Sequence, residues 1–245
     1  SAPKPSSAAS DVYKRQVLMV VSAAEHWTLN DGTLHPTGFW AEELVTPYSI
    51  FTDAGWDVDV ATPGGIAPTV DKVSLDESAG DAETLAAVTT KLEALEPVLA
   101  KPLDLDDVKV EDYDLVFYPG GHGPMEDLAV NETSARILTE RMANNAPVAL
   151  LCHAPAAVLA TEDTQGGSPF SGRTMTGFSN DEERAAGLAD KAPWLLEDRL
   201  VALGAEYTKA AEPAAPYVAV DGNLYTGQNP ASSKKLAEHL VKDLA

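Results

Sequence analysis

The chain has almost no cysteine. Cys152 is the only one among 245 residues, so no internal disulfide can form. This composition fits a reducing compartment, and we expect a cytoplasmic protein. Any chemistry that needs a thiol must therefore use Cys152.

Basic residues are also scarce. Lys and Arg number 17 against 38 Asp and Glu, which gives a formal net charge of −21. Such a charge repels phosphate backbones and anionic lipid headgroups, so we expect neither a nucleic-acid nor a membrane partner. No apolar run approaches the roughly 20 residues that span a bilayer.

Cofactor motifs and linkers are missing as well. No Cys/His cluster has zinc spacing, and no Walker or dinucleotide glycine motif occurs, so we expect no metal and no cofactor. Residues 1–16 are rich in Ser, Ala and Pro, and we expect a disordered lead-in. The apolar run at 17–21 is too short for a signal peptide. Without a dividing linker, residues 17–245 are predicted to form one domain.

What the sequence does contain is an alternation of strand and helix patterns. This alternation predicts an α/β fold with a mostly parallel, doubly wound sheet and helices on both faces. A hairpin signal lies at 221–223, and residues 74–105 look like a mostly helical insertion. The expected strands are 17–21, 57–61, 113–118, 147–151 and 173–177, and the expected helices are 38–54, 133–144, 193–203 and 230–244.

Ligands of such sheets bind beyond the carboxyl ends of the strands. Three turns meet there: the one after Val21, the turn at 119–123, and the one that begins with Cys152. A strand that runs straight into a helix places Cys152 at a nucleophile elbow with an exposed side chain. The following helix N-terminus is expected to lower the thiol pKa below about 8.5. A lone cysteine in an apolar strand is more often a buried hydrophobe, but the sharp turn favours catalysis.

The glycines of the 119–123 turn allow backbone to approach a ligand closely. Gly120 and Gly121 are therefore candidates to present N–H groups to an oxyanion, although an ordinary tight turn has the same composition. His122 and His153 are candidate bases.

Two glutamates, Glu42 and Glu43, lie in a segment that is otherwise apolar or aromatic. A carboxyl buried there has a raised pKa, which suits a proton shuttle near neutral pH. The alternative is that the glutamates face water, and we expect this of one of them.

Five short motifs, in this order along the chain, resemble those of the ThiJ/PfpI superfamily, which has the class I glutamine amidotransferase-like fold with a flavodoxin-like sheet. The set is most similar to the subgroup of glyoxalase III enzymes and heat-shock chaperones. The motifs occupy residues 37–43 with Pro47, 118–123, 151–155, 176–179 and 226–232.

The resemblance implies a role for each matching residue. Cys152 is the nucleophile, His153 is its neighbouring histidine, and Glu43 contacts the thiol because Pro47 fixes the register. Glu183 is implied as the acidic partner of His153, with Asp181 and Glu182 as open alternatives. The backbone of Gly121 and His153 would form the oxyanion hole, and Gly120 and His122 complete the substrate-binding turn.

The implied activity is that of a glutathione-independent glyoxalase, a D-lactate dehydratase-type lyase. It would convert methylglyoxal or glyoxal to lactate or glycolate through a cysteine hemithioacetal, in a homodimer. A stress chaperone, with an exposed apolar patch at 194–196, and a protein deglycase are alternatives. A cysteine peptidase or amidase needs an open cleft, which the insertion is expected to narrow. The absence of proline beside Glu238 and His239 argues against glutaminase activity.

Overall fold

The structure is a computed structural model that describes residues 13–245. The expected disorder of residues 1–12 lies outside the described part. The boundary at residue 16 is wrong, because Gln16 already belongs to the first strand and the Tyr13 hydroxyl donates to Asp114 at 2.7 Å.

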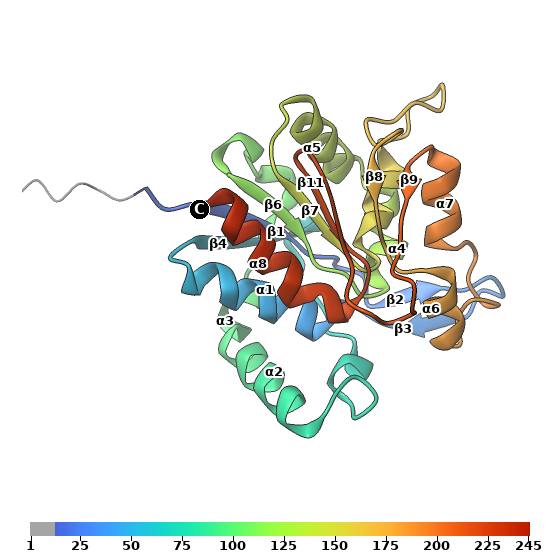
Figure 1. Cartoon of the computed structure of the whole chain (residues 1–245). Helices are drawn as coiled ribbons and strands as arrows, with labels where there is room; N and C mark the ends of the chain where they lie inside the picture. The colour runs from blue at the N-terminus through green and yellow to red at the C-terminus, as the bar shows by residue number, and fades with distance from the viewer. Residues whose placement is uncertain (1–12) are drawn as a thin grey trace, which may run out of the picture.

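The strands and α-helices alternate over most of the chain (Figure 1). The strands are β1 Gln16–Val20, β2 His26–Thr28, β3 Leu34–Pro36, β4 Asp57–Thr62, β5 Leu103–Asp104, β6 Leu115–Tyr118, β7 Val148–Leu151, β8 Thr174–Met175, β9 Glu206–Tyr207, β10 Val218–Asp221 and β11 Leu224–Gly227. The α-helices are α1 Ala41–Asp53, α2 Ala82–Ala94, α3 Glu96–Leu99, α4 Gly123–Glu126, α5 Glu132–Ala143, α6 Asn180–Ala185, α7 Leu196–Leu203 and α8 Ser233–Leu244.

The central sheet has the strand order β10-β11-β7-β6-β1-β4-β5. All neighbours pair in parallel except β10 and β11, which form the predicted antiparallel hairpin. The parallel core β4-β1-β6-β7-β11 has the flavodoxin-like order, so the predicted fold class is confirmed. Short segments were missed: β5 at the end of the insertion, the β2–β3 hairpin, and β9, which pairs with β8 outside the central sheet.

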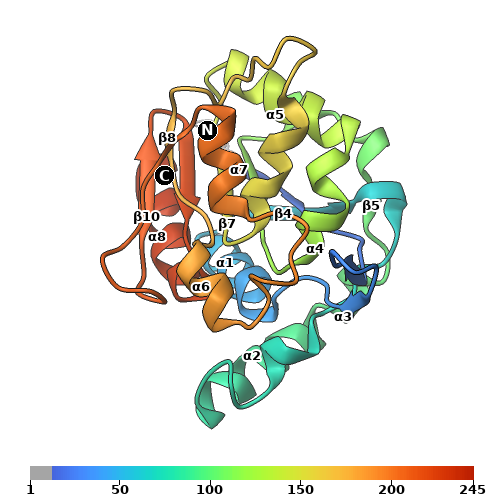
Figure 2. The ribbon, with the colours of Figure 1, turned by 90° about the vertical axis from the view of Figure 1, so that its right-hand side faces the viewer.

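Side-chain alternation along β1 divides the core into two layers. Val17, Met19 and Val21 pack on one face of the sheet, whereas Leu18 and Val20 pack on the other. Helices α1 and α8 cover the first face, and α5, α7 and a 3₁₀ helix, Ala154–Thr161, cover the second (Figure 2). Both faces of the sheet are therefore buried, as the continuous apolar strands predict.

The insertion leaves the sheet after β4 and returns as β5. Its longest helix, α2, projects from the body of the protein below α1 and α3 (Figure 1). Its Asp81 side chain caps α2 by accepting from the Thr84 N–H. Among residues 13–245, no helix combines the length and apolar character that crossing a membrane requires.

Candidate active site

Cys152 sits at a strained elbow directly after β7. Its φ is +62°, in the left-handed region that non-glycine residues seldom adopt. Two backbone hydrogen bonds fix this conformation: the Cys152 N–H donates to the Gly227 carbonyl at 2.8 Å, and the Phe178 N–H donates to the Cys152 carbonyl at 2.9 Å. The elbow is therefore held between the end of β11 and the turn before α6.

The predicted exposure of this side chain is wrong, because Cys152 is only 2% exposed. It packs into the core layer shared with α1 and α8.

Glu43 approaches Cys152 from the first turn of α1. The Trp40 N–H donates to the Gly120 carbonyl at 3.0 Å, which ties the start of α1 to the glycine turn. In return, the Gly120 N–H donates to Glu43 Oε1 at 3.1 Å. The Glu43 carboxyl lies close enough to the Cys152 thiol for each group to influence the pKa of the other. A Cβ at position 120 would lie 2.7 Å from Glu43 Oε1, so this approach requires glycine.

Of the two glutamates, Glu43 is fully buried and Glu42 is half-buried. Burial raises the pKa of Glu43 well above its usual value, and the bonds from Cys152 and Gly120 only partly oppose this. A raised pKa is what a carboxyl needs if it is to take up a proton and release it during a reaction.

The predicted fall of the Cys152 pKa is contradicted. Burial raises the pKa of the thiol, and the charge of Glu43 raises it further; the Gly121 N–H acts in the opposite direction. The favourable dipole at the next helix is outweighed, because that helix is a 3₁₀ segment and the sulfur has lost its water. Near neutral pH, the thiol and the carboxyl of Glu43 together therefore retain a proton.

On the other side of the sulfur lies a pair of histidines that share one carboxylate. His153 Nδ1 is 3.4 Å from Cys152 Sγ, and its Nε2–H donates to Glu183 Oε2 at 2.7 Å. His122 Nε2–H donates to Glu183 Oε1, also at 2.7 Å. Charges and hydrogen bonds from both histidines lower the pKa of Glu183 far below its usual range, against the effect of burial.

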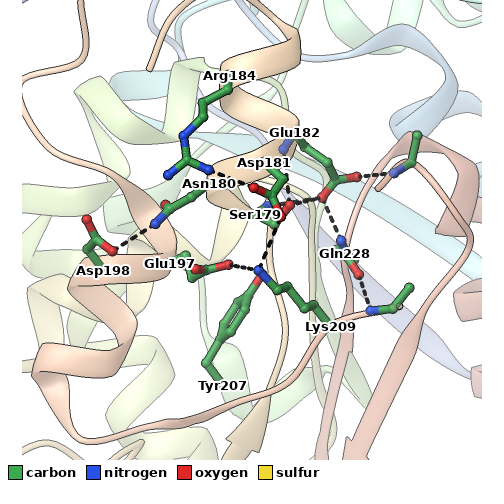
Figure 3. A network of polar contacts seen from close by, with 12 residues as sticks. Ser179, Asn180, Asp181, Glu182, Arg184, Glu197, Asp198, Tyr207, Lys209 and Gln228 are labelled. Atoms are coloured by element: carbon green, nitrogen blue, oxygen red, sulfur yellow. Dashed lines mark hydrogen bonds and ion pairs between the residues drawn. The ribbon is translucent and has the colours of Figure 1, made fainter. Parts of the chain in front are cut away.

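The geometry at α6 distinguishes the three candidate acids. Successive residues of a helix point about 100° apart, so only one of them can face His153. Asp181 is exposed and pairs with Arg184 at 2.6 Å (Figure 3). Glu182 is buried and accepts from Gln228 Nε2 at 2.6 Å, on the side of the C-terminal loop (Figure 3). Glu183 is the one that faces the two histidines.

A cavity of about 520 Å³ adjoins the site. Trp40 and Phe178 belong to its wall and also touch the site, since the Trp40 N–H binds Gly120 and the Phe178 ring lies 4.3 Å from the His153 ring. The insertion contributes residues 78–81 and Thr84 to the opposite wall. The insertion therefore lines the cavity next to the site, whereas the expectation that it narrows the entrance stays a prediction.

His122, His153 and Glu183 are also the residues best placed to hold a metal ion, since their ligand atoms all lie within 4.8 Å of one another. Sequence spacing does not reveal this group, because its members come from three separate turns. Each carboxylate oxygen of Glu183 already accepts a hydrogen bond from one of the histidines, so the polar atoms that face one another within this group are hydrogen-bonded.

Sequence reasoning missed the aromatic residues around the histidine pair. Trp27 stacks on His122 with ring centroids 5.1 Å apart, and His35 lies edge-on to it at 6.4 Å. Trp27 and His35 lie on the β2–β3 hairpin, whose three-residue strands are too short to show a pattern.

The expected apolar patch at 194–196 is also wrong. Leu196 is buried, Trp194 packs against the core, and the Arg199 guanidinium covers the Trp194 ring at 5.0 Å. Since Trp194 and Leu195 are only partly exposed, this segment does not form the expected exposed apolar patch.

The fold and the site together define a class of α/β proteins. Its features are a parallel sheet, a cysteine at a strand-to-helix turn, a buried glutamate beside that cysteine, and a histidine paired with a carboxylate. The model of the DJ-1/PfpI family matches residues 34–243, and the chain belongs to this family. The predicted ThiJ/PfpI membership is thus confirmed.

Individual relatives agree with this assignment. The protein/nucleic acid deglycase HchA of Staphylococcus aureus (strain Newman) is 29% identical over 242 residues, covering 94% of this chain and 80% of the relative. The crystal structure of the 24 kDa Rapid Encystment Protein of Francisella tularensis is 30% identical, with a TM-score of 0.80 over 94% of this chain and 99% of that one. Glyoxalase III of Candida albicans shares the fold at 23% identity, with a TM-score of 0.79 over 93% of this chain and 96% of that one.

Proposed function

We propose that this protein is a glutathione-independent glyoxalase that converts methylglyoxal or glyoxal to the corresponding 2-hydroxy acid. The observation that carries the proposal is the placement of one thiol between two proton acceptors. The Glu43 carboxyl lies beside the Cys152 thiol and raises its pKa, and His153 Nδ1 lies 3.4 Å from the sulfur. Isomerisation of a dicarbonyl needs both a nucleophile and a group that moves a proton between adjacent carbons.

In the first step, the Cys152 sulfur attacks the aldehyde carbon while its proton passes to His153 Nδ1. The carbonyl oxygen becomes an alkoxide, which the Gly121 and His153 N–H groups are proposed to hold. Glu183 accepts from His153 Nε2–H and stabilises the imidazolium that forms. The His153 imidazolium then returns the proton to this oxygen, so the product of the step is a neutral hemithioacetal.

In the second step, Glu43 removes the proton from the former aldehyde carbon and returns it to the neighbouring carbon. The first carbon becomes a thioester carbonyl and the second a carbinol. Water then cleaves the thioester, releases the 2-hydroxy acid and regenerates the thiol. The hydroxyl proton of the hemithioacetal passes through His153 to the neighbouring carbonyl oxygen, which becomes the hydroxyl of the carbinol. In the hydrolysis, one water gives its OH to the acyl carbon and its remaining proton to the sulfur, and no electrons leave the substrate.

The proposal is tested by incubating the protein with methylglyoxal, without glutathione, and measuring lactate. Cys152→Ala should abolish lactate formation and retain the circular-dichroism spectrum of the wild type. Lys234→Ala is a matched control, because Lys234 is an exposed residue of α8 that pairs only with Glu238. Lactate formation by Cys152→Ala at the wild-type rate would end the proposal.

Protein deglycation is a second candidate, favoured by the size of the cavity beside the site. A space of about 520 Å³ is much larger than methylglyoxal requires and leaves room for a modified side chain. The Staphylococcus aureus relative is named as a protein/nucleic acid deglycase. The expected exclusion of nucleic acid, which rested on net charge, therefore stays a prediction, as does the homodimer. Release of lactate from preformed methylglyoxal–arginine adducts, after free dicarbonyl has been removed, would distinguish the two activities.

A further inference from the structure

The cavity beside the site carries charge of one sign. Its wall includes the carboxylates of Glu42, Asp81 and Glu182, and no Lys, Arg or His of the described residues lines it. Most of the other lining residues are small or apolar, and Trp40 and Phe178 lie where the cavity adjoins the site. A molecule that fills this space therefore meets negative charge without a compensating cation.

The three carboxylates differ in what they already bind. Glu182 is buried and accepts from two side-chain amides of the turn after β11. Asp81 is exposed to water and accepts from the Thr84 N–H. Glu42 is half-buried, and burial raises its pKa without an opposing hydrogen bond or cation among the described residues. Glu42 is therefore the carboxylate of this wall that is partly withdrawn from water and still has no partner.

Glu42 and Glu43 face different sides of the first turn of α1. Successive residues of a helix point about 100° apart, so Glu43 lies beside Cys152 whereas Glu42 lines the cavity. The charge of Glu42 raises the pKa of Glu43, so the two carboxyls lie within electrostatic reach of each other. The cavity thus begins one residue away from the group that is proposed to move the protons of the substrate.

The dimensions of the cavity suit a substituent of the substrate. Its volume of about 520 Å³ lies within the range of small-molecule sites. A 2-oxoaldehyde that is bound through its aldehyde carbon carries its substituent on the second carbon, beyond the two carbons that react. Aromatic rings attract cations to their faces, so Trp40 and Phe178 can add to the effect of Glu42.

We propose that this cavity is the subsite for the substituent of the substrate, and that Glu42 determines its charge preference. 2-Oxoaldehydes with a cationic or neutral substituent are accepted, and those with a carboxylate or phosphate group are disfavoured. The reaction of these compounds rests on the proposed function, whereas the preference of the cavity for cations does not. Glu42 acts on specificity and takes no part in proton transfer.

Binding of two unreactive probes tests the subsite without turnover. Benzyltrimethylammonium and phenylacetate each carry one phenyl ring and one charge, and neither reacts with a thiol. Binding is followed at pH 8 through the indole ¹H–¹⁵N signal of Trp40, which Trp40→Phe identifies among the four tryptophans. We expect the cation to bind about tenfold more tightly than the anion, because Glu42 attracts the first and repels the second, each by a few fold.

Two substitutions of Glu42 and one matched control follow. Glu42→Gln should reduce the ratio of the two affinities to about twofold, and Glu42→Lys should reverse it. Glu140→Gln removes the same charge from an exposed position of α5, on the other face of the sheet, and should leave the ratio unchanged. Equal affinities in the wild type would overturn the proposal. An equal loss in Glu140→Gln would also overturn it, because the preference would then come from the net charge of −21.

Turnover of substituted phenylglyoxals then separates this inference from the proposed function. The ratio of kcat/KM for the 4-trimethylammonio compound to that for the 4-carboxylate should fall about fivefold from the wild type to Glu42→Gln. The comparison between proteins cancels the intrinsic reactivity of the two compounds. A probe preference in a protein that forms no mandelate would refute the glyoxalase and leave the subsite intact. Mandelate formation with the same ratio in both proteins would refute the role of Glu42 and leave the glyoxalase intact.

Discussion

Replacing Glu43 with Gln should make the thiol more reactive and the enzyme much slower. The glutamine carbonyl can still accept from the Gly120 N–H at the position of Oε1, 3.1 Å away. Its amide takes the place of Oε2, which is buried and has no hydrogen-bond partner among the described residues. The packing is preserved, but the group can no longer carry a proton.

Two opposite effects follow. Loss of the Glu43 charge removes one of the causes that raise the Cys152 pKa, and the new amide can donate to sulfur, so the thiolate fraction should increase. Alkylation of Cys152 by iodoacetamide at neutral pH should therefore be faster than in the wild type. Turnover of methylglyoxal should fall by about 10²–10⁴-fold, because general acid–base transfer of the carbon-bound proton is lost.

Stability provides a third, independent readout of the same carboxyl. Its pKa is raised in the folded chain above the usual value of 4.5, so the folded state binds this proton more tightly than the unfolded state. The resulting stabilisation is fully present below pH 4.5 and is lost as pH rises through the folded pKa, by up to about 1.4 kcal/mol per pH unit.

Glu43→Gln cannot titrate, so its free energy of unfolding should fall less steeply over this interval. Urea titrations at a series of pH values measure the difference, and the alkylation and turnover rates are taken on the same samples. Turnover within a few fold of the wild type, or slower alkylation, would show that Glu43 does not exchange protons with the sulfur.

Three further substitutions test the scaffold of the site. Gly120→Ala places a methyl group 2.7 Å from Glu43 Oε1 and against the Leu151 carbonyl, so calorimetry should show a loss of about 1–3 kcal/mol; an unchanged melting temperature would contradict the close approach. Glu182→Gln points an amide donor at groups that already donate to Glu182, namely the Ala214 N–H and the side-chain amides of Gln228 and Asn229. The free energy of unfolding, measured with urea, should fall by about 3–5 kcal/mol, and a loss below 1 kcal/mol would show that Glu182 is not the acceptor of these donors. Cys152→Gly should be more stable than Cys152→Ala by about 1 kcal/mol, since φ is +62° at the elbow, whereas the reverse order would argue against stored backbone strain.

The main strands of the sheet could be predicted from the sequence because each of them has a strong local pattern. Residues 17–21 and 147–151 are continuous apolar runs, and such runs form strands buried on both faces. β5 was missed because its two residues pair only after the insertion has returned to the sheet edge, which no local pattern records. The 193–203 helix begins later than predicted, at Leu196.

At the site, the sequence indicated which residues take part, but it did not indicate how deeply they are buried or what surrounds them. The turn and its neighbours indicate Cys152, yet nothing local shows that the elbow would be sealed by the layer between the sheet and α1. The error about the thiol pKa follows directly, because the expected dipole effect assumed a solvated sulfur. The choice among Asp181, Glu182 and Glu183 depended on the rotation of α6 about its axis. The Ser179–Glu182 capping box is a local pattern that could have assigned Glu182 to the start of the helix. Which of the other two acids faces His153 depends on how the helix packs on the rest of the fold.

Burial has opposite consequences at the two ends of the site. At Cys152 and Glu43 it favours the neutral forms, so the resting thiol keeps its proton. At Glu183, two N–H donors compensate the lost water and the carboxylate stays ionised. Proton transfer from sulfur to His153 therefore creates a negative charge on a sulfur that is shielded from solvent. This transfer becomes favourable only when the charge can pass to an oxygen within reach of the Gly121 N–H. A resting protein of this design carries a protonated thiol, and the thiol loses its proton as it attacks a carbonyl.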